Sequence, residues 1–257
     1  MTDRDDFFVG WAAKAPAADR RFFLGAGLGL LATTGGISAL LASRQNGGGT
    51  GTWPQGDVRE WRGRVTSSPY PMMRVLDEDG QVRTALLSCM NKCTPELRID
   101  QYGDQEVIVR GSPIRRGPHL MIATQDDGSW IEAAPDQTNA DFSFPESETF
   151  GEAELKGMIL DTKCWFGAMN PSSGKVHKSC ASLCIRSGLA PAFYVRSLQD
   201  QSRLMIMVAE DGTPVGNDVL PFVADPMALR GRIERMGDIL ILRTAVSSFE
   251  RLRRRPW

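Results

Sequence analysis

The fold is decided by residues 106–124, EVIVRGSPIRRGPHLMIAT, together with residues 226–244, PMALRGRIERMGDILILRT. A shift of 120 positions aligns the two stretches and pairs Arg110-Gly111 with Arg230-Gly231 and Leu120 with Leu240. Each stretch places short apolar runs on either side of a glycine-containing turn, which predicts two strands joined by that turn. We therefore expect a duplicated β-rich unit.

Each unit contains five short strand signals separated by turn residues. They cover residues 61–66, 72–76, 82–87, 106–110 and 119–123 in the first unit, and residues 155–160, 192–196, 203–209, 229–235 and 239–243 in the second. Five short strands that end in a closing hairpin fit an OB-like barrel better than a sandwich. The predicted fold class is mainly β, with two tandem small OB-like β-barrels, a helical Cys/His insertion in the second barrel, and one transmembrane helix before them.

An extra segment follows the first strand of the second unit. Residues 62–65, RGRV, align with residues 156–159, KGMI, at a shift of 94 positions, whereas the later strands align at a shift of 120. The difference means that about 26 residues are inserted between the first strand and the next. We place the insertion at residues 161–191. Insertions into a repeated scaffold are where function is commonly added, so this segment is the first candidate for the site.

The insertion holds three of the five cysteines and one of the two histidines, in the pattern C-x12-H-x2-C-x3-C. We expect a short helix from residue 176 or 177 up to Gly188, on which His177, Cys180 and Cys184 share one face. Cys164, at the end of the preceding strand, would close over that face. Thiolate and imidazole donors suit zinc, or copper with Met169 as a soft ligand, so a metal site is one interpretation.

Two other interpretations of these cysteines stay open. Cys164 could form a disulfide with Cys180 or Cys184 in an oxidising compartment, which would leave the third thiol buried as a small apolar residue. Alternatively, Cys180 or Cys184 could be the attacking group of a thiol oxidoreductase, with His177 lowering its pKa. Cys89 and Cys93, only four positions apart, are expected to form a local disulfide.

Residues 22–43 contain no charged residue and would span about 33 Å as a helix, enough for a bilayer core of about 30 Å. Arg20 and Arg21 precede the span, and with Phe23-Leu24 they resemble a twin-arginine export signal. Leu40 occupies the −3 position before a cleavage site at Ala42, so we expect an uncleaved anchor. The basic flank predicts an inner-membrane, single-pass protein with most of the chain in the periplasm.

The span carries small residues on one face, a pattern that allows a second transmembrane helix to approach closely. One interpretation is a helix partner in an integral-membrane complex, packed on Gly25, Gly29, Ala32, Gly36 and Ala39. The other is that the small residues reflect the Gly/Ala-rich composition of twin-arginine signals. The expected domain boundaries are a cytoplasmic segment 1–21, the membrane helix 22–43, a Gly-rich tether 44–56, the first barrel 57–124, a linker 125–150, the second barrel 151–252, and a basic tail 253–257 that could touch membrane lipid.

Composition narrows the functional classes. Among 257 residues, 30 Lys and Arg balance 31 Asp and Glu for a net charge of −1, and this near-zero charge argues against a nucleic-acid binder. The sequence has no CxxCH haem motif, no GxGxxG and no supported Ser-His-Asp arrangement. His119, beside the Pro118 turn, is interpreted as a surface residue.

The motif Asp161-x-x-Cys164, His177-x-x-Cys180-Ala181-x-x-Cys184 and Pro191 resembles a family of exported, membrane-anchored bacterial proteins in which this signature interrupts an OB-like barrel. The resemblance implies fold and compartment, and it implies no substrate. The leading hypothesis is a non-catalytic periplasmic accessory subunit of an integral-membrane respiratory or electron-transfer complex. The alternatives are a periplasmic zinc- or copper-binding protein and a thiol-disulfide oxidoreductase.

Overall fold

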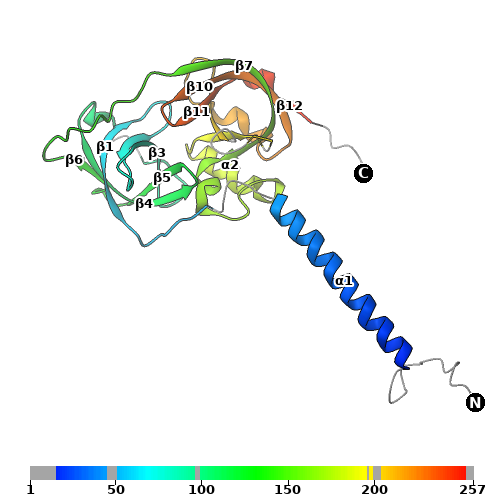
Figure 1. Ribbon diagram of the computed structural model, residues 1–257. Coiled ribbons are helices and arrows are strands. Elements are labelled where there is room, and N and C mark those ends of the chain that lie inside the picture. The colour runs from blue at the N-terminus through cyan, green and yellow to red at the C-terminus, as the bar shows by residue number, and fades with distance from the viewer. Residues whose placement is uncertain (1–15, 45–50, 96–98, 196, 199–203, 253–257) are drawn as a thin grey trace, which may run out of the picture. The chain divides into compact units, whose positions relative to one another are not determined.

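The computed structural model describes residues 16–44, 51–95, 99–195, 197–198 and 204–252. Most of the predicted cytoplasmic segment, part of the tether and the basic tail 253–257 lie outside these residues. The chain divides into two units, Met1–Gly47 and Gly48–Trp257, which are described separately. The first contains the helix α1, and the strands of the described residues lie in the second (Figure 1).

Five strands close the first barrel: β1 (Arg59–Thr66), β2 (Met72–Leu76), β3 (Val82–Cys89), β4 (Val107–Arg116) and β5 (His119–Thr124). Their order around the barrel is β1-β2-β3-β5-β4, and β4 pairs back with β1. All these pairs are antiparallel except β3 with β5, which is parallel. Alternate side chains point inward and form a core that includes Trp61, Val75, Leu87, Val109 and Ile122.

The second barrel repeats this topology. It consists of β7 (Glu148–Asp161), β8 (Pro191–Tyr194), β9 (Leu204–Val208), β10 (Met227–Met236) and β11 (Ile239–Arg243). The order is β7-β8-β9-β11-β10, β10 pairs back with β7, and β9 pairs in parallel with β11. The prediction of two tandem OB-like barrels is confirmed, and the insertion lies between the first and second strands of the second barrel, as expected.

Two glycines show why the repeat survives in the sequence. A Cβ atom on Gly63 in β1 would lie 1.8 Å from the carbonyl oxygen of Arg74, and one on Gly157 in β7 would lie 2.3 Å from that of Tyr194. Both distances are shorter than any real contact, so the second strand of each barrel crosses the first too closely for a side chain. The two barrels therefore require glycine at the same place.

The barrels pack against each other through apolar side chains on their outer surfaces. Tyr70 donates a hydrogen bond from its hydroxyl to the carbonyl of Met207 at 2.8 Å, and Arg74 forms an ion pair with Asp238 at 3.0 Å. Both contacts join residues of the first barrel to residues of the second. The shared cluster contains Met72, Leu86, Ile114, Met121 and Ala123 from the first barrel and Leu160, Trp165, Phe166, Leu204, Ile206 and Ile241 from the second.

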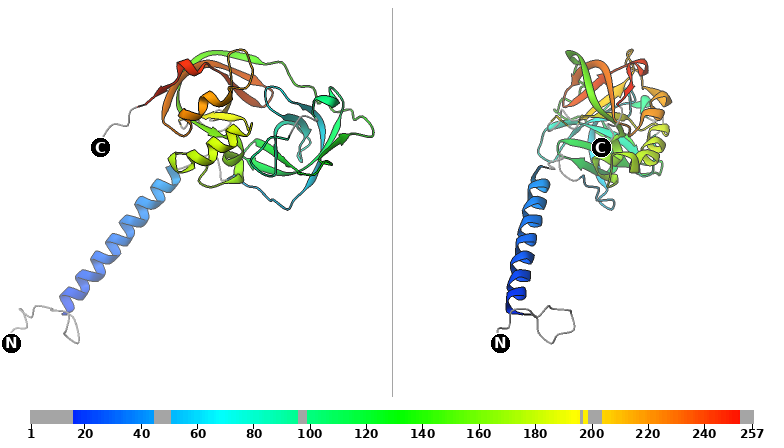
Figure 2. Two further views of the ribbon diagram at one scale, coloured as in Figure 1. Left: turned by 180° about the vertical axis from the view of Figure 1, so that it is seen from behind. Right: turned by 90° about the vertical axis from the view of Figure 1, so that its right-hand side faces the viewer.

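Two segments expected to connect domains contribute to the folded unit. Within the predicted linker, β6 (Ile131–Ala133) pairs with β4, and Phe142 is buried. Within the predicted tether, Thr52 exchanges two backbone hydrogen bonds with Arg115. A last strand, β12 (Glu250–Arg251), pairs with the start of β10. The views from behind and from the side in Figure 2 show the strands of both barrels and the insertion in one body.

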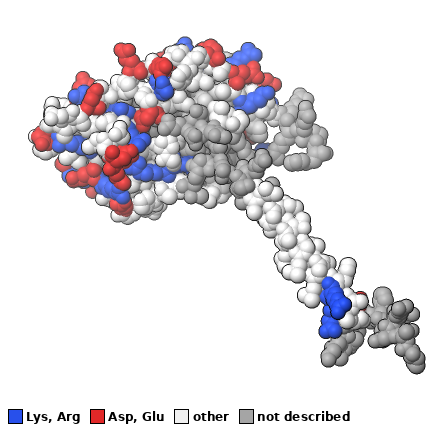
Figure 3. Space-filling model, viewed as in Figure 1, with Lys and Arg blue, Asp and Glu red and all other residues white. Residues whose placement is uncertain are grey.

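The helix α1 (Ala17–Arg44) is long and apolar enough to cross a membrane over residues Ala17–Leu40, with a mean hydropathy of 1.5. Figure 3 shows basic residues at one end of this helix and uncharged residues along the rest of its described surface. On the face of the barrels in that view, acidic and basic residues are mixed. A helix of this kind is consistent with one membrane span, and the predicted helix 22–43 lies within it.

Candidate metal centre

The insertion folds into three short helical pieces that surround its sulfur atoms. A π-helical turn (Cys164–Ala168) follows β7, and a 3-10 turn (Lys175–His177) leads into α2 (Lys178–Arg186). The helix ends before Gly188, which has a positive φ of 92° and therefore favours glycine. The predicted helix is confirmed, although its α-helical part begins one residue after His177.

Three thiols meet where the π-helical turn faces α2. The Sγ atoms of Cys164, Cys180 and Cys184 lie within 4.8 Å of one another, and those of Cys164 and Cys180 are 3.7 Å apart. Cys164 and Cys184 are buried and Cys180 is half-buried. All three are free thiols in this structure, and the Sδ atom of Met169 lies 3.8 Å from Cys180 Sγ. We call Cys164, Cys180 and Cys184 the sulfur cluster.

The spacing of the sulfur cluster fits a metal ion. Thiolate ligands at about 2.3 Å from a tetrahedral zinc ion lie about 3.8 Å apart, close to the separation between Cys164 and Cys180. A thioether such as that of Met169 is a soft ligand, which favours Cu(I) among the ions that thiolates bind. The geometry therefore admits both of the ions expected from the sequence.

His177 belongs to a neighbouring group and not to the sulfur cluster itself. Its Nε2 atom lies 3.0 Å from Asp161 Oδ2, and both side chains are buried. Asp161 also accepts a hydrogen bond from the backbone N–H of Cys164 at 2.8 Å through Oδ1. The possible ligand atoms thus form two groups among the described residues, one of three sulfurs and one of Asp161, Cys164 and His177, which share Cys164.

This arrangement differs from the expected Cys3His set on one helical face. His177 lies at the N-cap of α2, ahead of its first α-helical residue, and its ring is hydrogen-bonded to Asp161. A carboxylate that holds a histidine and a neighbouring ligand in this way acts commonly as an outer support of metal ligands. Asp161 was recognised in the motif, but its role as the shared hydrogen-bond partner was not.

Two lysines place positive charge beside the sulfur cluster. Lys92 Nζ lies 3.1 Å from Cys180 Sγ, and this hydrogen bond raises the pKa of Lys92. Lys163 is buried next to Cys164 in the chain, and burial lowers the pKa of its ammonium to about 8. The hydrogen bond with Cys184 is the main cause, and burial the second, of a raised pKa for the Cys164 thiol. Metal binding would therefore have to displace a proton from Cys164.

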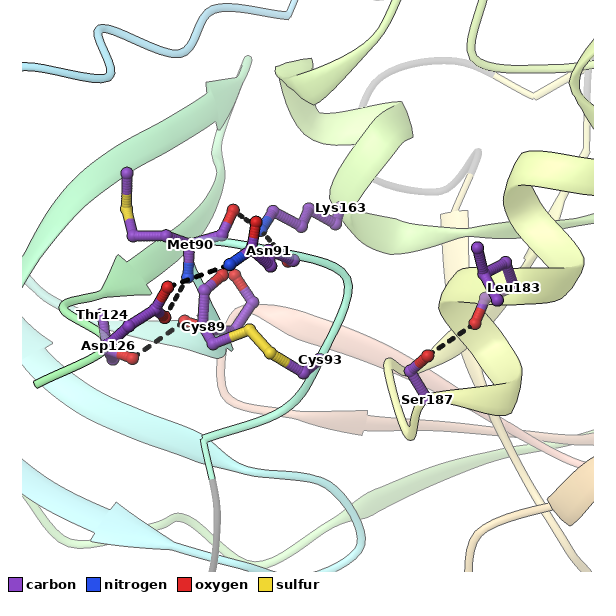
Figure 4. The surroundings of a disulfide bond; sticks show 10 residues. Cys89, Met90, Asn91, Cys93, Thr124, Asp126, Lys163, Leu183 and Ser187 are labelled. Carbon is purple, nitrogen blue, oxygen red and sulfur yellow. Dashed lines mark hydrogen bonds between the residues drawn. A yellow bond between two sulfur atoms is a disulfide. The ribbon is translucent and has the colours of Figure 1, made fainter.

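The predicted local disulfide is present between Cys89 and Cys93. Lys163 points into the loop that this disulfide closes and donates hydrogen bonds to the carbonyls of Cys89 at 2.6 Å, Met90 at 3.0 Å and Asn91 at 2.6 Å (Figure 4). The first barrel therefore supplies contacts to the insertion of the second. Sequence reasoning did not assign Lys92 or Lys163 to the site, although their positions inside CMNKC and DTKC were the available signal.

His119 is buried, so its interpretation as a surface residue is wrong. Its ring packs at 5.3 Å from the ring of Phe166 and at 5.4 Å from that of Trp165, where the first barrel meets the insertion. Its Nε2 atom is buried without a hydrogen-bond partner among the described residues. Burial lowers the pKa of His119 to about 4. The turn beside Pro118 indicated exposure, but packing between the barrels overrides it.

Comparisons with protein-family models, with curated proteins and with solved structures find no match for this chain. The resemblance of the D-x-x-C and H-x-x-C-A-x-x-C signature to exported bacterial proteins stays a prediction.

Proposed function

We propose that this chain is a membrane-anchored periplasmic protein that binds a thiophilic metal ion, Zn²⁺ or Cu(I), in the sulfur cluster. The observation that carries the proposal is the convergence of three free thiols, from two helical pieces, within 4.8 Å of one another. The thiols also pack with Leu189 as small apolar residues, but the separation of two of them matches that of thiolate ligands around one ion.

The surroundings of the sulfur cluster support ligation over redox catalysis. Three thiolates around Zn²⁺ carry one net negative charge, and around Cu(I) they carry two. The ammonium of Lys92 beside Cys180 would offset one of these charges. Of the two thiols considered as the attacking group, Cys184 is buried, whereas Cys180 is half-buried with Lys92 beside it, but His177, the expected activating base, is bound to Asp161. The oxidoreductase interpretation therefore has less support, and a Cys164 disulfide remains the oxidised alternative.

The test is metal content of the full chain, purified from membranes in mild detergent under reducing, anaerobic conditions. We expect about one Zn²⁺ or Cu(I) per chain by elemental analysis after incubation with each ion separately. The triple variant Cys164→Ser, Cys180→Ser, Cys184→Ser should retain no metal. Ser187→Ala, which removes a hydroxyl from the same insertion, should bind metal normally. Equal metal in the triple variant and the unmodified chain would refute the proposal.

A second candidate function is a non-catalytic accessory subunit of an integral-membrane electron-transfer complex. The observation that favours it is the small-residue face of α1, where Gly25, Gly29 and Gly36 leave the helix backbone open to a partner helix. Under this proposal, Gly29→Leu with Gly36→Leu should abolish co-purification of membrane proteins with the chain. Leu31→Ile, a control that leaves the small-residue face intact, should not change co-purification. Recovery of the chain without any co-purifying membrane protein, from the parent as well as from the variants, would contradict the proposal.

A further inference from the structure

The loop closed by the Cys89–Cys93 disulfide contacts the insertion at two places, and the residue after the loop contacts it at a third. Lys92, within the loop, lies 3.1 Å from Cys180 Sγ. Lys163, next to Cys164, donates to three carbonyls of the loop. Beyond the loop, Thr94 approaches the end of α2 so closely that a Cβ on Gly188 would lie 2.9 Å from its Oγ1 atom. The first barrel thus contacts the insertion beside Cys164, at Cys180 and at the end of α2.

Lys92 lies beside the most exposed of the three thiols. Cys164 and Cys184 are buried, whereas Cys180 is half-buried and Lys92 is exposed. Lys92 is the group from the first barrel that lies on this sulfur. Any change in the loop that moves Lys92 would therefore alter access to the cluster and the charge beside it.

The loop keeps its shape through a small set of bonds. Besides the disulfide, the backbone N–H of Cys89 donates to the carbonyl of Cys93 at 3.0 Å. Asp126 accepts hydrogen bonds from the backbone N–H of Met90 at 3.2 Å and from Asn91 Nδ2 at 3.0 Å (Figure 4). These bonds to Asp126 fix the first half of the loop. The disulfide is the covalent restraint on the second half, which contains Lys92.

We propose that the Cys89–Cys93 disulfide is a redox-sensitive clamp that keeps Lys92 over Cys180 and so holds the metal ion in the sulfur cluster. The inference rests on the proposed metal-binding function and names its regulation. A dithiol reductant would open the clamp: two electrons and two protons pass from the dithiol, which becomes a disulfide, and the bond between Cys89 and Cys93 is replaced by two thiols. Lys92 is then released from Cys180, while the bonds to Asp126 still hold the half of the loop whose carbonyls bind Lys163.

The experiment compares the metal affinity of the full chain with that of Cys89→Ser, Cys93→Ser, which mimics the open loop without adding thiols. Affinity for Zn²⁺ and for Cu(I) is measured by competition with a chromophoric chelator. We expect the double variant to lose about 10- to 100-fold in affinity, the range for loss of an outer support of metal ligands. Lys92→Met should show part of this loss of affinity, and Lys92→Arg should show a smaller loss. Lys156→Met, which removes an exposed lysine on β7, should leave the affinity unchanged.

Alkylation of Cys180 by iodoacetamide, followed by peptide mass spectrometry without metal, locates the effect. The clamp predicts a changed alkylation rate of Cys180 in the double variant, because Lys92 lies against this thiol and its ammonium favours the thiolate. Unchanged affinity in a folded double variant, or in Lys92→Met, would overturn the inference, because it requires both the disulfide and the lysine. If circular dichroism shows that the double variant does not fold, the metal affinity of Lys92→Met is the test of the inference. Absence of metal binding by the parent chain would instead remove the proposed function, and the inference with it.

Discussion

Replacing His119 with phenylalanine should make the stability of the protein less sensitive to acid. His119 is 8% exposed between the first barrel and the insertion, and burial lowers its pKa from 6.5 to about 4. Because the unfolded chain binds a proton near pH 6.5 and the folded chain does not until about pH 4, stability contributed by neutral His119 is lost as pH falls through this window. The pKa difference corresponds to roughly 3 kcal/mol at pH 4.

The assay is guanidinium unfolding of the full chain in detergent, followed by tryptophan fluorescence, at steps from about pH 8 to about pH 4. Phenylalanine keeps a ring against Trp165 and Phe166 and removes the unpartnered Nε2 atom. Groups distant from position 119 titrate alike in both proteins, so the difference between the two stability curves reports on His119 and its charged neighbours Asp238 and Arg116. We expect that difference to grow by roughly 3 kcal/mol on acidification. A difference that stays constant across the pH range would refute the reasoning.

Three further predictions concern the scaffold. Gly157→Ala should destabilise the protein by about 3 kcal/mol or more in denaturant unfolding, because its Cβ would meet the Tyr194 carbonyl, whereas Gly56→Ala, where nothing lies within 4 Å, should have little effect. Tyr70→Phe should cost about 1–2 kcal/mol through its lost hydrogen bond to Met207, and an unchanged midpoint would contradict this. Asp161→Ala should cost about 3 kcal/mol, because it leaves the Cys164 N–H and His177 without their partner.

The strand pattern and the repeat were predictable because they are local properties of the chain. Alternation of apolar residues and the positions of turn residues depend on neighbours a few positions away, so strand β11 was predicted at its observed bounds and β2 likewise. The local disulfide between Cys89 and Cys93 was predictable for the same reason, since four positions separate the two residues. The segments predicted as linker and tether were less well described, because β6 and Thr52 pair with distant strands.

The two barrels, the place of the insertion, and the position of Cys180 and Cys184 on one helix follow from local patterns in the sequence. Three contacts depend on tertiary packing instead: His177 binds Asp161, Lys92 reaches Cys180 from the other barrel, and His119 is buried. Each of these contacts joins residues on different elements. Their meeting depends on how two barrels pack through their outer surfaces, which no local periodicity records.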